Sequence, residues 1–260
     1  MNNKTSGIAY LISPILILCL LQVFASCGAQ ESTIQHTNIQ EVHDEVLTLD
    51  TIVVQTTEEL IQGIRSNRLI KLTSDVYSLP ATLHIDSIHH LTIVGTGASI
   101  LKPSDPNTNV LHLTNCDHIK LDSLKLVEGK IGLKTKDVTH LSVSNSEITG
   151  CSILIFELEK SRHIKFQNTD FHHNILIASV LGGFTYSTHD VTFLDCDFVH
   201  NIPKMPGNPA FNLMENYTDF DKPIVFTNCT FKDNKGFKWY GKKFKLNDCQ
   251  TDSSGIMEMP

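Results

Sequence analysis

Polar side chains occur at alternate positions of several short apolar segments, and their mixture of types could hold a sugar. In VLHLT, IGLKT, ILIFELE, AFNLM and FKWYG the alternation is typical of β-strands, which direct successive side chains to opposite faces. The polar face would carry imidazole, ammonium, carboxylate and amide groups, which together can donate and accept hydrogen bonds. The candidate carbohydrate-binding residues on this face are His112, Lys134, Glu157, Asn212 and Lys238.

Aromatic residues gather near two insertions in the longest repeat unit and could stack on sugar rings. The insertions are VHNIPKMPGNP, from Val199 to Pro209, and ENYTDFDKP, from Glu215 to Pro223. Loops on a rigid scaffold often carry binding residues. Tyr217 and Tyr240 join the candidate carbohydrate-binding residues on this basis. Trp239 is equally consistent with filling the core near the C-terminal end.

An eight-residue word recurs along the chain and predicts the elements that would position these side chains. IKFQNTDF reads apolar, any, apolar, any, turn residue, small residue, any, apolar. Its copies are IKLDSLKL, LSVSNSEI, VTFLDCDF and IVFTNCTF, with a degraded copy in FKLNDCQT. The copies start at positions 119, 141, 164, 191, 224 and 244. Such a period is typical of a solenoid, and the short, β-branched segments favour three strands per coil.

Within each copy, alternation predicts which residues form the core and where the chain bends. The residues that would point inward across a bend at Ser123 are Ile119, Leu121, Leu124 and Leu126. Asn and Asp tolerate the left-handed backbone that such a bend needs. The bend column continues at Asn145, Asn168, Asp195, Asn228 and Asp248. The predicted core file contains Leu121, Val143, Phe166, Phe193 and Phe226.

The opening segment VVQTTEELIQGIRSNRLIKLTSDVYSL resembles the N-terminal cap of the right-handed parallel β-helix proteins related to pectate lyase, in which a helix plugs the open end. HHLTIVGTGASILKP and NVLHLTNCDHIKLDSLKL resemble the early coils of that family. The resemblance implies an all-β fold, a right-handed parallel β-helix solenoid over residues 50–250, with a capping helix from Glu58 to Arg65. It also implies a substrate cleft along the sheet formed by VLHLT, IGLKT, ILIFELE, LIASV, AFNLM and FKWYG.

The resemblance carries an enzymatic alternative as well. A polysaccharide lyase of this fold needs a Lys or Arg base beside a uronate carboxylate, and usually calcium held by acidic residues. Lys134 could be that base, but Glu157 would pair with it and no aspartate cluster converges on it. Hydrolases need two or three close carboxylates, and the NTD string from Asn168 to Asp170 falls on the structural bend. We therefore expect no catalytic residue, cofactor or metal, with calcium only under the lyase alternative.

Two further files of residues follow the repeat. The residues before successive copies are His90, His118, His140 and His163, then Asp190 with His189 beside it. Imidazoles could bind a transition metal, but side chains stacked on one line point the same way, which favours simple surface stacking. The small inward residues after the bend are Ser146, Thr169, Cys196, Cys229 and Cys249. Two of these thiols could bridge, although packing as free, small apolar side chains is favoured.

The N-terminal residues indicate a secretory leader. An apolar run from Ile8 to Phe24 follows Lys4, and FASC resembles the lipobox of bacterial lipoproteins, whose cysteine carries the lipid. We expect a signal peptide over residues 1–26, lipid attachment at Cys27, a flexible tether over 27–49 and a C-terminal tail over 251–260. An ordinary signal peptide and an uncleaved anchor remain alternatives.

The charge pattern excludes one class of partner. The formal net charge is −7 and no basic stripe occurs, whereas nucleic-acid binding needs such a stripe. The sequence therefore predicts a monomeric lipoprotein of the cell envelope, expected on the bacterial outer membrane, that binds extended carbohydrate without cleaving it. The alternative is a small polysaccharide lyase of the pectate lyase-like fold.

Overall fold

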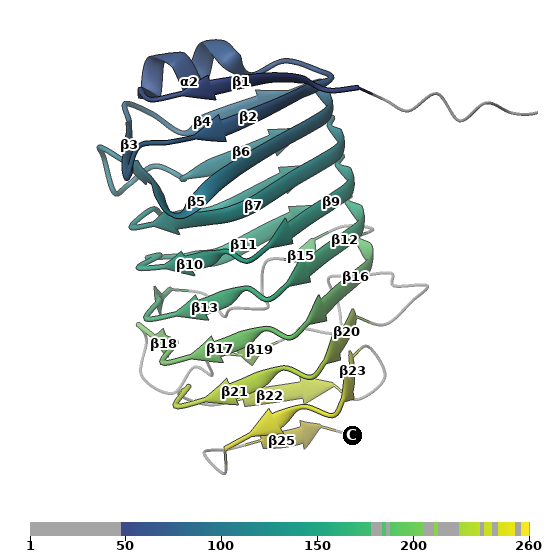
Figure 1. Ribbon diagram of the computed structural model, residues 1–260. Coiled ribbons are helices and arrows are strands. Elements are labelled where there is room, and N and C mark those ends of the chain that lie inside the picture. The colour runs from purple at the N-terminus through teal and green to yellow at the C-terminus, as the bar shows by residue number, and fades with distance from the viewer. Residues whose placement is uncertain are drawn as a thin grey trace, which may run out of the picture. The chain divides into compact units, whose positions relative to one another are not determined.

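The computed structural model shows a solenoid of parallel β-strands with one short helix at its N-terminal end (Figure 1). This confirms the predicted right-handed parallel β-helix. The structure describes residues 48–177, 184–185, 188–204, 211–212, 224–234, 237–240, 244–252 and 256–259. The predicted leader, Cys27 and most of the tether lie outside these residues. Among the described residues, no helix is long and apolar enough to cross a membrane.

Helix α2, Thr57–Gly63, covers the first coil (Figure 1). Its N-terminus is fixed by a capping box: the Thr56 hydroxyl accepts from the Glu59 amide, and the Glu59 carboxylate accepts from the Thr56 amide. The helix was predicted from Glu58 to Arg65 and ends earlier, because the C-cap residue Ile64 is extended. The helix closes the N-terminal end of the solenoid, as the cap resemblance implied.

The largest sheet has two arms that meet at a bend in each coil. Both arms are built from parallel strands paired in register. The first arm contains β1 (Asp50–Val54), β2 (Arg68–Leu72), β9 (Thr139–Ser144), β12 (Arg162–Gln167), β16 (His189–Leu194), β20 (Ile224–Thr227) and β23 (Phe244–Asn247). The second arm contains β3 (Val76–Leu79), β10 (Glu147–Thr149), β13 (Asp170–His172), β17 (Asp197–Val199), β21 (Thr230–Lys232) and β24 (Gln250–Thr251). Two long strands run through both arms, β5 (His89–Pro103) and β7 (Asp117–Val127).

Smaller sheets complete the coils. The five-stranded sheet contains β4 (Leu83–Asp86), β6 (Leu111–Thr114), β8 (Ile131–Lys136), β11 (Leu154–Glu159) and β15 (Phe184–Thr185). A three-stranded sheet contains β19 (Phe211–Asn212), β22 (Phe237–Tyr240) and β25 (Ile256–Met259). A two-stranded pair contains β14 (Ile175–Leu176) and β18 (Ile202–Pro203). The strand β25 therefore lies within the segment predicted as a C-terminal tail.

One strand prediction is wrong. The segment LIASV was expected to continue the five-stranded sheet after β11. Its first residue, Leu176, instead belongs to β14, which pairs with Pro203 of β18. The strand that pairs with β11 is β15, where Phe184 lies beside Leu158. A short apolar run is by itself an ambiguous signal for a strand, and it does not show which sheet the strand joins.

The predicted core file is confirmed. The strand register aligns Leu121 with Val143, Val143 with Phe166, Phe166 with Phe193 and Phe193 with Phe226. All of these side chains are buried. The rings of Phe166 and Phe193 stack with centroids 4.8 Å apart, and those of Phe193 and Phe226 with centroids 4.6 Å apart. Each aromatic ring thus shields the next from water, which ties neighbouring coils together.

The predicted bend column is also confirmed. A left-handed backbone occurs at every position proposed for it, with φ between 48° and 56°: Ser123, Asn145, Asn168, Asp195, Asn228 and Asp248. Side-chain amides connect neighbouring bends, since the Asn168 Nδ2 donates to Asn145 Oδ1 at 2.8 Å. The coil that contains β5 differs, because its register with β7 shifts between Val94 and Ser99, around Gly97 at φ 83°.

A second ladder of amides is buried and was missed from the sequence. Asn174, Asn201 and Asn234 occupy successive coils just after the second arm. Asn174 Nδ2 donates to Asn201 Oδ1 at 2.9 Å, and Asn201 Nδ2 donates to Asn234 Oδ1 at 3.0 Å. The same nitrogens also donate to the backbone carbonyls of Ile148 and Phe171. Burial of these amides is tolerated because their polar atoms are bonded.

The cysteine file is reduced. Cys116, Cys151, Cys196, Cys229 and Cys249 are all free. Cys196 and Cys229 are buried, and the hydrogen bond with the Cys196 thiol, followed by burial, raises the pKa of Cys229 above the usual thiol range. These thiols pack as small buried side chains, the favoured prediction.

Candidate functional site

The predicted polar side chains of the five-stranded sheet form a continuous row on its outer face. Strand pairing places His84 beside His112, His112 beside Lys134, and Lys134 beside Glu157. The row therefore runs along the solenoid, one residue per coil, at the spacing of about 4.8 Å between neighbouring strands. Of the predicted candidates, the structure brings His112, Lys134 and Glu157 together. His84 was not predicted, although it occupies the same alternate position of TLHI.

A second polar row lies two residues further along the same strands. It contains Asp86, Thr114, Lys136 and Glu159. Lys134 Nζ lies 2.8 Å from Glu157 Oε2, and Lys136 Nζ lies 3.8 Å from Glu159 Oε1. Both ion pairs connect neighbouring coils, so they hold the long side chains against the sheet. The outer face is thus a strip of paired donors and acceptors above an apolar inner face.

His112 is the titratable group of this face with a shifted pKa. Its pKa is lowered from the ordinary histidine value, first by burial and then by the charges of His84 and Lys134. The rings of His84 and His112 are tilted against each other with centroids 5.1 Å apart. A lowered pKa keeps the imidazole of His112 neutral near pH 7, so one ring nitrogen accepts and the other donates a hydrogen bond.

Strands β19 and β22 contain three other predicted site residues, Asn212, Lys238 and Tyr240. The backbones of Asn212 and Lys238 pair across β19 and β22, as expected, but these strands belong to the three-stranded sheet and not to the sheet of β6, β8 and β11 in which they were predicted. Tyr240 ends β22 and pairs with Met259 of β25. The side chains of these residues, and Tyr217 as a whole, lie outside the described part of the chain.

A shallow pocket of about 230 Å³ lies at the bend beside the second arm. Its lining includes Lys125, Glu147 and Asp170. Glu147 is paired twice, with Lys125 Nζ at 2.6 Å and with His172 Nε2 at 2.9 Å. Burial, followed by the charge of Asp197, raises the pKa of the Asp170 carboxyl. The pocket is therefore lined by two carboxyl groups and one ammonium group, and the imidazole of His172 contacts one of the carboxylates.

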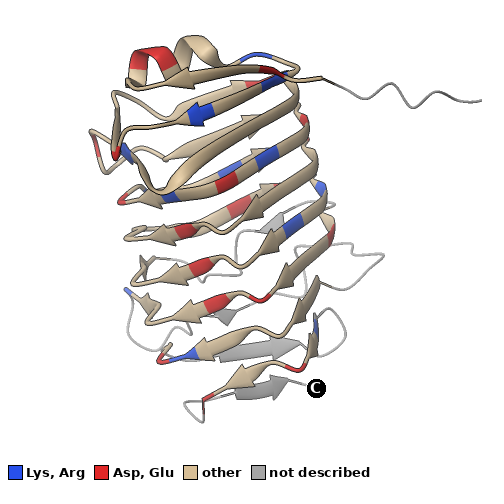
Figure 2. Ribbon diagram, viewed as in Figure 1, with Lys and Arg blue, Asp and Glu red and all other residues tan. Residues whose placement is uncertain are grey.

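The sequence analysis treated Asp170 only as part of the bend and did not find this pocket. The strand register aligns Glu147 with Asp170 and Asp170 with Asp197. A signal was available, because an acidic residue follows the small inward residue in NSEI, NTDF and DCDF. Figure 2 shows acidic residues on the successive second-arm strands β10, β13 and β17, as the register requires.

The predicted histidine file forms a stacked ladder, as favoured from the sequence. Ring centroids are 4.7 Å apart between His90 and His118, 4.4 Å between His118 and His140, and 4.8 Å between His140 and His163. Each of these residues has a left-handed backbone. Burial acts to raise the pKa of Asp117 at this corner, but hydrogen bonds from Thr139 and the histidines outweigh burial and hold that pKa well below its usual range.

Comparison with known proteins identifies the fold. The family model described as "Right handed beta helix region" matches residues 107–257. No curated protein matches the chain. The chain is similar to the crystal structure of an alginate lyase from Paenibacillus sp. str. FPU-7, with 14% identity and a TM-score of 0.38, covering 80% of this chain and 98% of that one.

Two further solved structures are similar at the same level. Jun a 1, the major allergen from cedar pollen, is 13% identical with a TM-score of 0.44, covering 81% of both chains. Pectate lyase Pel9A is 8% identical with a TM-score of 0.42, covering 81% of this chain and 79% of that one. Identities and TM-scores this low carry no inference about activity.

Proposed function

Because the chain belongs to the right-handed β-helix family, whose coils here stack polar side chains in register, we propose that it binds extended carbohydrate along the outer face of the five-stranded sheet without cleaving it. The observation that carries this proposal is the pair of polar rows from β4 to β11. A repeating ligand fits a repeating surface, since each coil places two polar side chains on this face one strand spacing further along.

The charge pairing on this face supports binding over cleavage. A lyase base must offer a lone pair to the proton beside a uronate carboxylate. The ammonium of Lys134 is instead held by the Glu157 carboxylate at 2.8 Å, and Lys136 has Glu159 as its neighbour. A protonated amine in an ion pair has no lone pair to accept that proton. The same pairing fixes both side chains, which lowers the entropy cost of presenting them to a ligand.

Binding and turnover can be measured on one preparation. The purified protein is applied to a glycan array and to pectic, alginate and glycosaminoglycan polymers, with and without calcium. The proposal expects affinity for at least one polymer and no unsaturated product or new reducing ends. Lys134→Ala and His112→Ala should each weaken binding, and Tyr217→Ala and Tyr240→Ala test the predicted aromatic contribution. Lys120→Ala, an exposed lysine on the outside of β7, is the matched control and should bind normally.

Turnover would favour the lyase instead. Unsaturated product that is lost in Lys134→Ala would overturn the binding proposal in favour of a polysaccharide lyase. New reducing ends without unsaturation, lost in Asp170→Asn but retained in Lys134→Ala, would move the chemistry to the pocket beside the second arm. Absence of both binding and turnover would leave a structural or protein-binding role.

We further propose that the solenoid is carried on a lipid anchor at Cys27 in the cell envelope. The leader and the FASC string support this proposal. Because a lipobox cysteine carries the lipid, Cys27→Ser should release a soluble form or leave an unprocessed precursor of lower mobility. Unchanged mobility and membrane fractionation of the Ser variant would contradict the anchor and leave the carbohydrate proposal untouched.

A further inference from the structure

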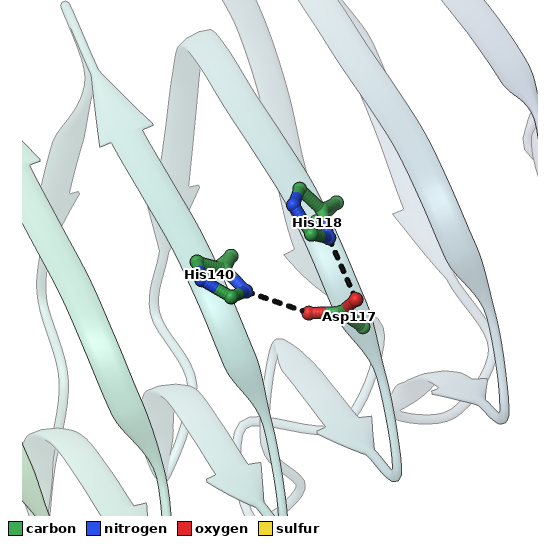
Figure 3. Close-up of side chains that lie close together, drawn as sticks. All are labelled: Asp117, His118 and His140. Carbon is green, nitrogen blue, oxygen red and sulfur yellow. Dashed lines mark hydrogen bonds and ion pairs between the residues drawn. The ribbon is translucent and has the colours of Figure 1, made fainter. Parts of the chain in front are cut away.

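Three potential metal ligands converge at the corner where β7 and β9 begin. Figure 3 shows the rings of His118 and His140 on neighbouring coils, both turned toward the carboxylate of Asp117. Asp117 Oδ2 lies 2.6 Å from His118 Nδ1, and Asp117 Oδ1 lies 2.9 Å from His140 Nδ1. Both carboxylate oxygens are thus directed at imidazole nitrogens. The sequence indicated the histidine file but not the aspartate between its rungs.

The fold holds these three groups in place before any ligand arrives. The left-handed backbone at His118 (φ 54°) and His140 (φ 52°) turns both side chains to the same side of the corner. Their rings stack at 4.4 Å with an interplanar angle of 24°. The Thr139 hydroxyl donates to Asp117 Oδ1 and orients the carboxylate. A preorganised set of ligands loses little conformational freedom on binding.

The distances suit a small transition metal. One ligand atom from each residue lies within 4.8 Å of the other two. Zinc binds nitrogen and oxygen ligands at about 2.0–2.1 Å, so ligand atoms around a tetrahedral ion lie about 3.4 Å apart. The two nitrogen-to-oxygen contacts must open by about 0.5–0.8 Å, a small rotation about side-chain bonds, to admit an ion of this size.

Metal binding also decides which ring nitrogen of His118 and His140 carries the proton. In a hydrogen bond to carboxylate, Nδ1 carries the ring proton; in a metal complex the same nitrogen must offer its lone pair. Each neutral ring can hold its proton on Nε2 instead. The side chains of His118 and His140 are 47% and 48% exposed, so the exchange takes place through water. Metal binding through Nδ1 therefore needs each ring to carry its proton on Nε2.

We propose that Asp117, His118 and His140 bind a divalent transition metal ion through the Asp117 carboxylate and two Nδ1 atoms, with water in the remaining positions. Imidazole ligands favour zinc, copper and nickel over calcium and magnesium, which prefer all-oxygen sites. Three protein ligands leave at least one position open, as in zinc sites that hold a water molecule. This site lies at a corner of the coil, separate from the carbohydrate face, and does not depend on the proposed carbohydrate binding.

The chain contains a matched comparison for this site. His200 Nε2 lies 3.3 Å from Asp233 Oδ2, and both side chains are 48% exposed. This pair offers the same two ligand types on neighbouring coils, outside the three-residue group. If three converging ligands hold the metal, replacement of His200 should not change its affinity. If the metal instead binds nonspecifically to exposed His and Asp pairs, replacement of His200 and replacement of His140 should reduce binding equally.

The test is calorimetric titration of the tag-free full chain with zinc chloride and, separately, nickel chloride. The proposal expects one equivalent bound, with affinity reduced more than about tenfold in His140→Gln and in Asp117→Asn, since even supporting residues of metal sites cost about 10–100-fold. His200→Gln should bind as the unaltered chain does. Absence of saturable binding, or equal losses in His140→Gln and His200→Gln, would overturn the proposal.

Folding is checked separately so that a misfolded variant cannot imitate loss of the site. Thermal unfolding followed by circular dichroism should show wild-type transitions for His140→Gln without metal, and a metal-dependent increase in Tm only in chains that retain all three ligands. Cobalt(II) added in place of zinc gives visible absorption bands that report its ligand field. Bands unchanged by the His140→Gln and Asp117→Asn substitutions would place the ion elsewhere and contradict the assignment.

Discussion

The buried amide ladder and the exposed histidine ladder of this solenoid differ in what their polar atoms contact. In the buried ladder, the Asn201 side chain donates to the Phe171 carbonyl at 2.8 Å and accepts from Asn174 at 2.9 Å. In the exposed ladder, the rings of His118 and His140 contact each other face to face and bond to one carboxylate. Both ladders repeat once per coil, so the repeat itself does not distinguish them.

This difference in contacts separates repeated residues that can take part in chemistry from those that cannot. The buried amides are bonded to backbone and to each other, so their replacement leaves other buried groups unpaired. The exposed imidazoles keep a ring nitrogen near water and depend on the backbone only for their direction. We infer that the amide ladder holds the coils together, while the histidine ladder can be altered with little loss of stability. Unfolding measurements on chains with substitutions in either ladder test this inference.

The aromatic file sets the scale for a purely structural ladder. Phe193 is buried and stacks between Phe166 and Phe226. Phe193→Ala should lower the free energy of unfolding by about 3–5 kcal/mol, as for other buried aromatic residues. Urea unfolding followed by circular dichroism measures the loss. A change below about 1 kcal/mol would show that this file does not carry the stability of the central coils.

The amide ladder should come close to that scale. Asn201→Ala removes the donor to the Phe171 carbonyl and the acceptor for the Asn174 amide, and each unpaired buried group costs about 1–3 kcal/mol. We expect a total loss of about 3 kcal/mol by the same urea measurement. Asn168→Gly is the control, because it removes an exposed ladder amide and keeps the left-handed backbone. Equal losses in the two variants would end the distinction between buried and exposed ladders.

Much of the fold could be predicted because its determinants lie close together in the sequence. Alternation identified the file from Leu121 to Phe226, and the Asn or Asp at each bend marked the left-handed turn. These signals act within eight residues. The adjacency of His112, Lys134 and Glu157 followed from the same period, since in-register stacking turns equal positions in successive strands into neighbours.

The remainder could not be predicted because its determinants lie one coil apart and coil length varies. Asn174 contacts Asn201 across 27 residues, and Asn201 contacts Asn234 across 33 residues. The strand that follows β11 in its sheet, β15, lies further along the chain than the period from β8 to β11 predicts, which explains the wrong placement of LIASV. The pairing of Asp117 with His140 depends on side-chain direction at a left-handed residue, which alternation does not encode.

Asp170 has a partly exposed carboxyl group whose raised pKa should make the free energy of unfolding depend on pH. The pKa of Asp170 is raised in the folded protein by burial and by Asp197, so the charged carboxylate opposes folding at neutral pH. Asp170→Asn should therefore stabilise the protein at pH 7, by less than about 1 kcal/mol because water screens an exposed group. The gain should shrink as pH falls through the folded pKa and vanish below about 3.9, the unfolded value.

Urea unfolding at several pH values between 3 and 8 follows this gain. Asp197→Asn should make the effect of Asp170→Asn smaller, because the like charge that contributes to the shift is gone. A gain that stays constant across the range would contradict an electrostatic origin.

The histidine ladder should tolerate replacement. His163→Asn removes one ring from the stack, while Asn tolerates the left-handed backbone at this position (φ 56°). The side chain is 43% exposed and its contact with Asp190 is a surface ion pair, so we expect a change within about 0.5 kcal/mol in the free energy of unfolding. A loss near that of Asn201→Ala would show that stacking of exposed rings stabilises the coils, which would contradict the distinction between the two ladders.

His84 and His112 form a second histidine contact, on the outer face of the five-stranded sheet, and it is tested by titration instead of unfolding. His112 is more buried than the rings of His118, His140 and His163 and lies beside Lys134. Its pKa should lie below the ordinary histidine value of about 6.5, because burial and then the charges of His84 and Lys134 disfavour the imidazolium form. Titration of the ring Hε1 resonances by NMR measures this value directly. Lys134→Met removes one of the two positive charges but keeps the apolar stem, so the pKa of His112 should rise without reaching 6.5, because burial remains. A rise to the ordinary value would show that charge outweighs burial on this face, and no change would show that water already screens the two groups.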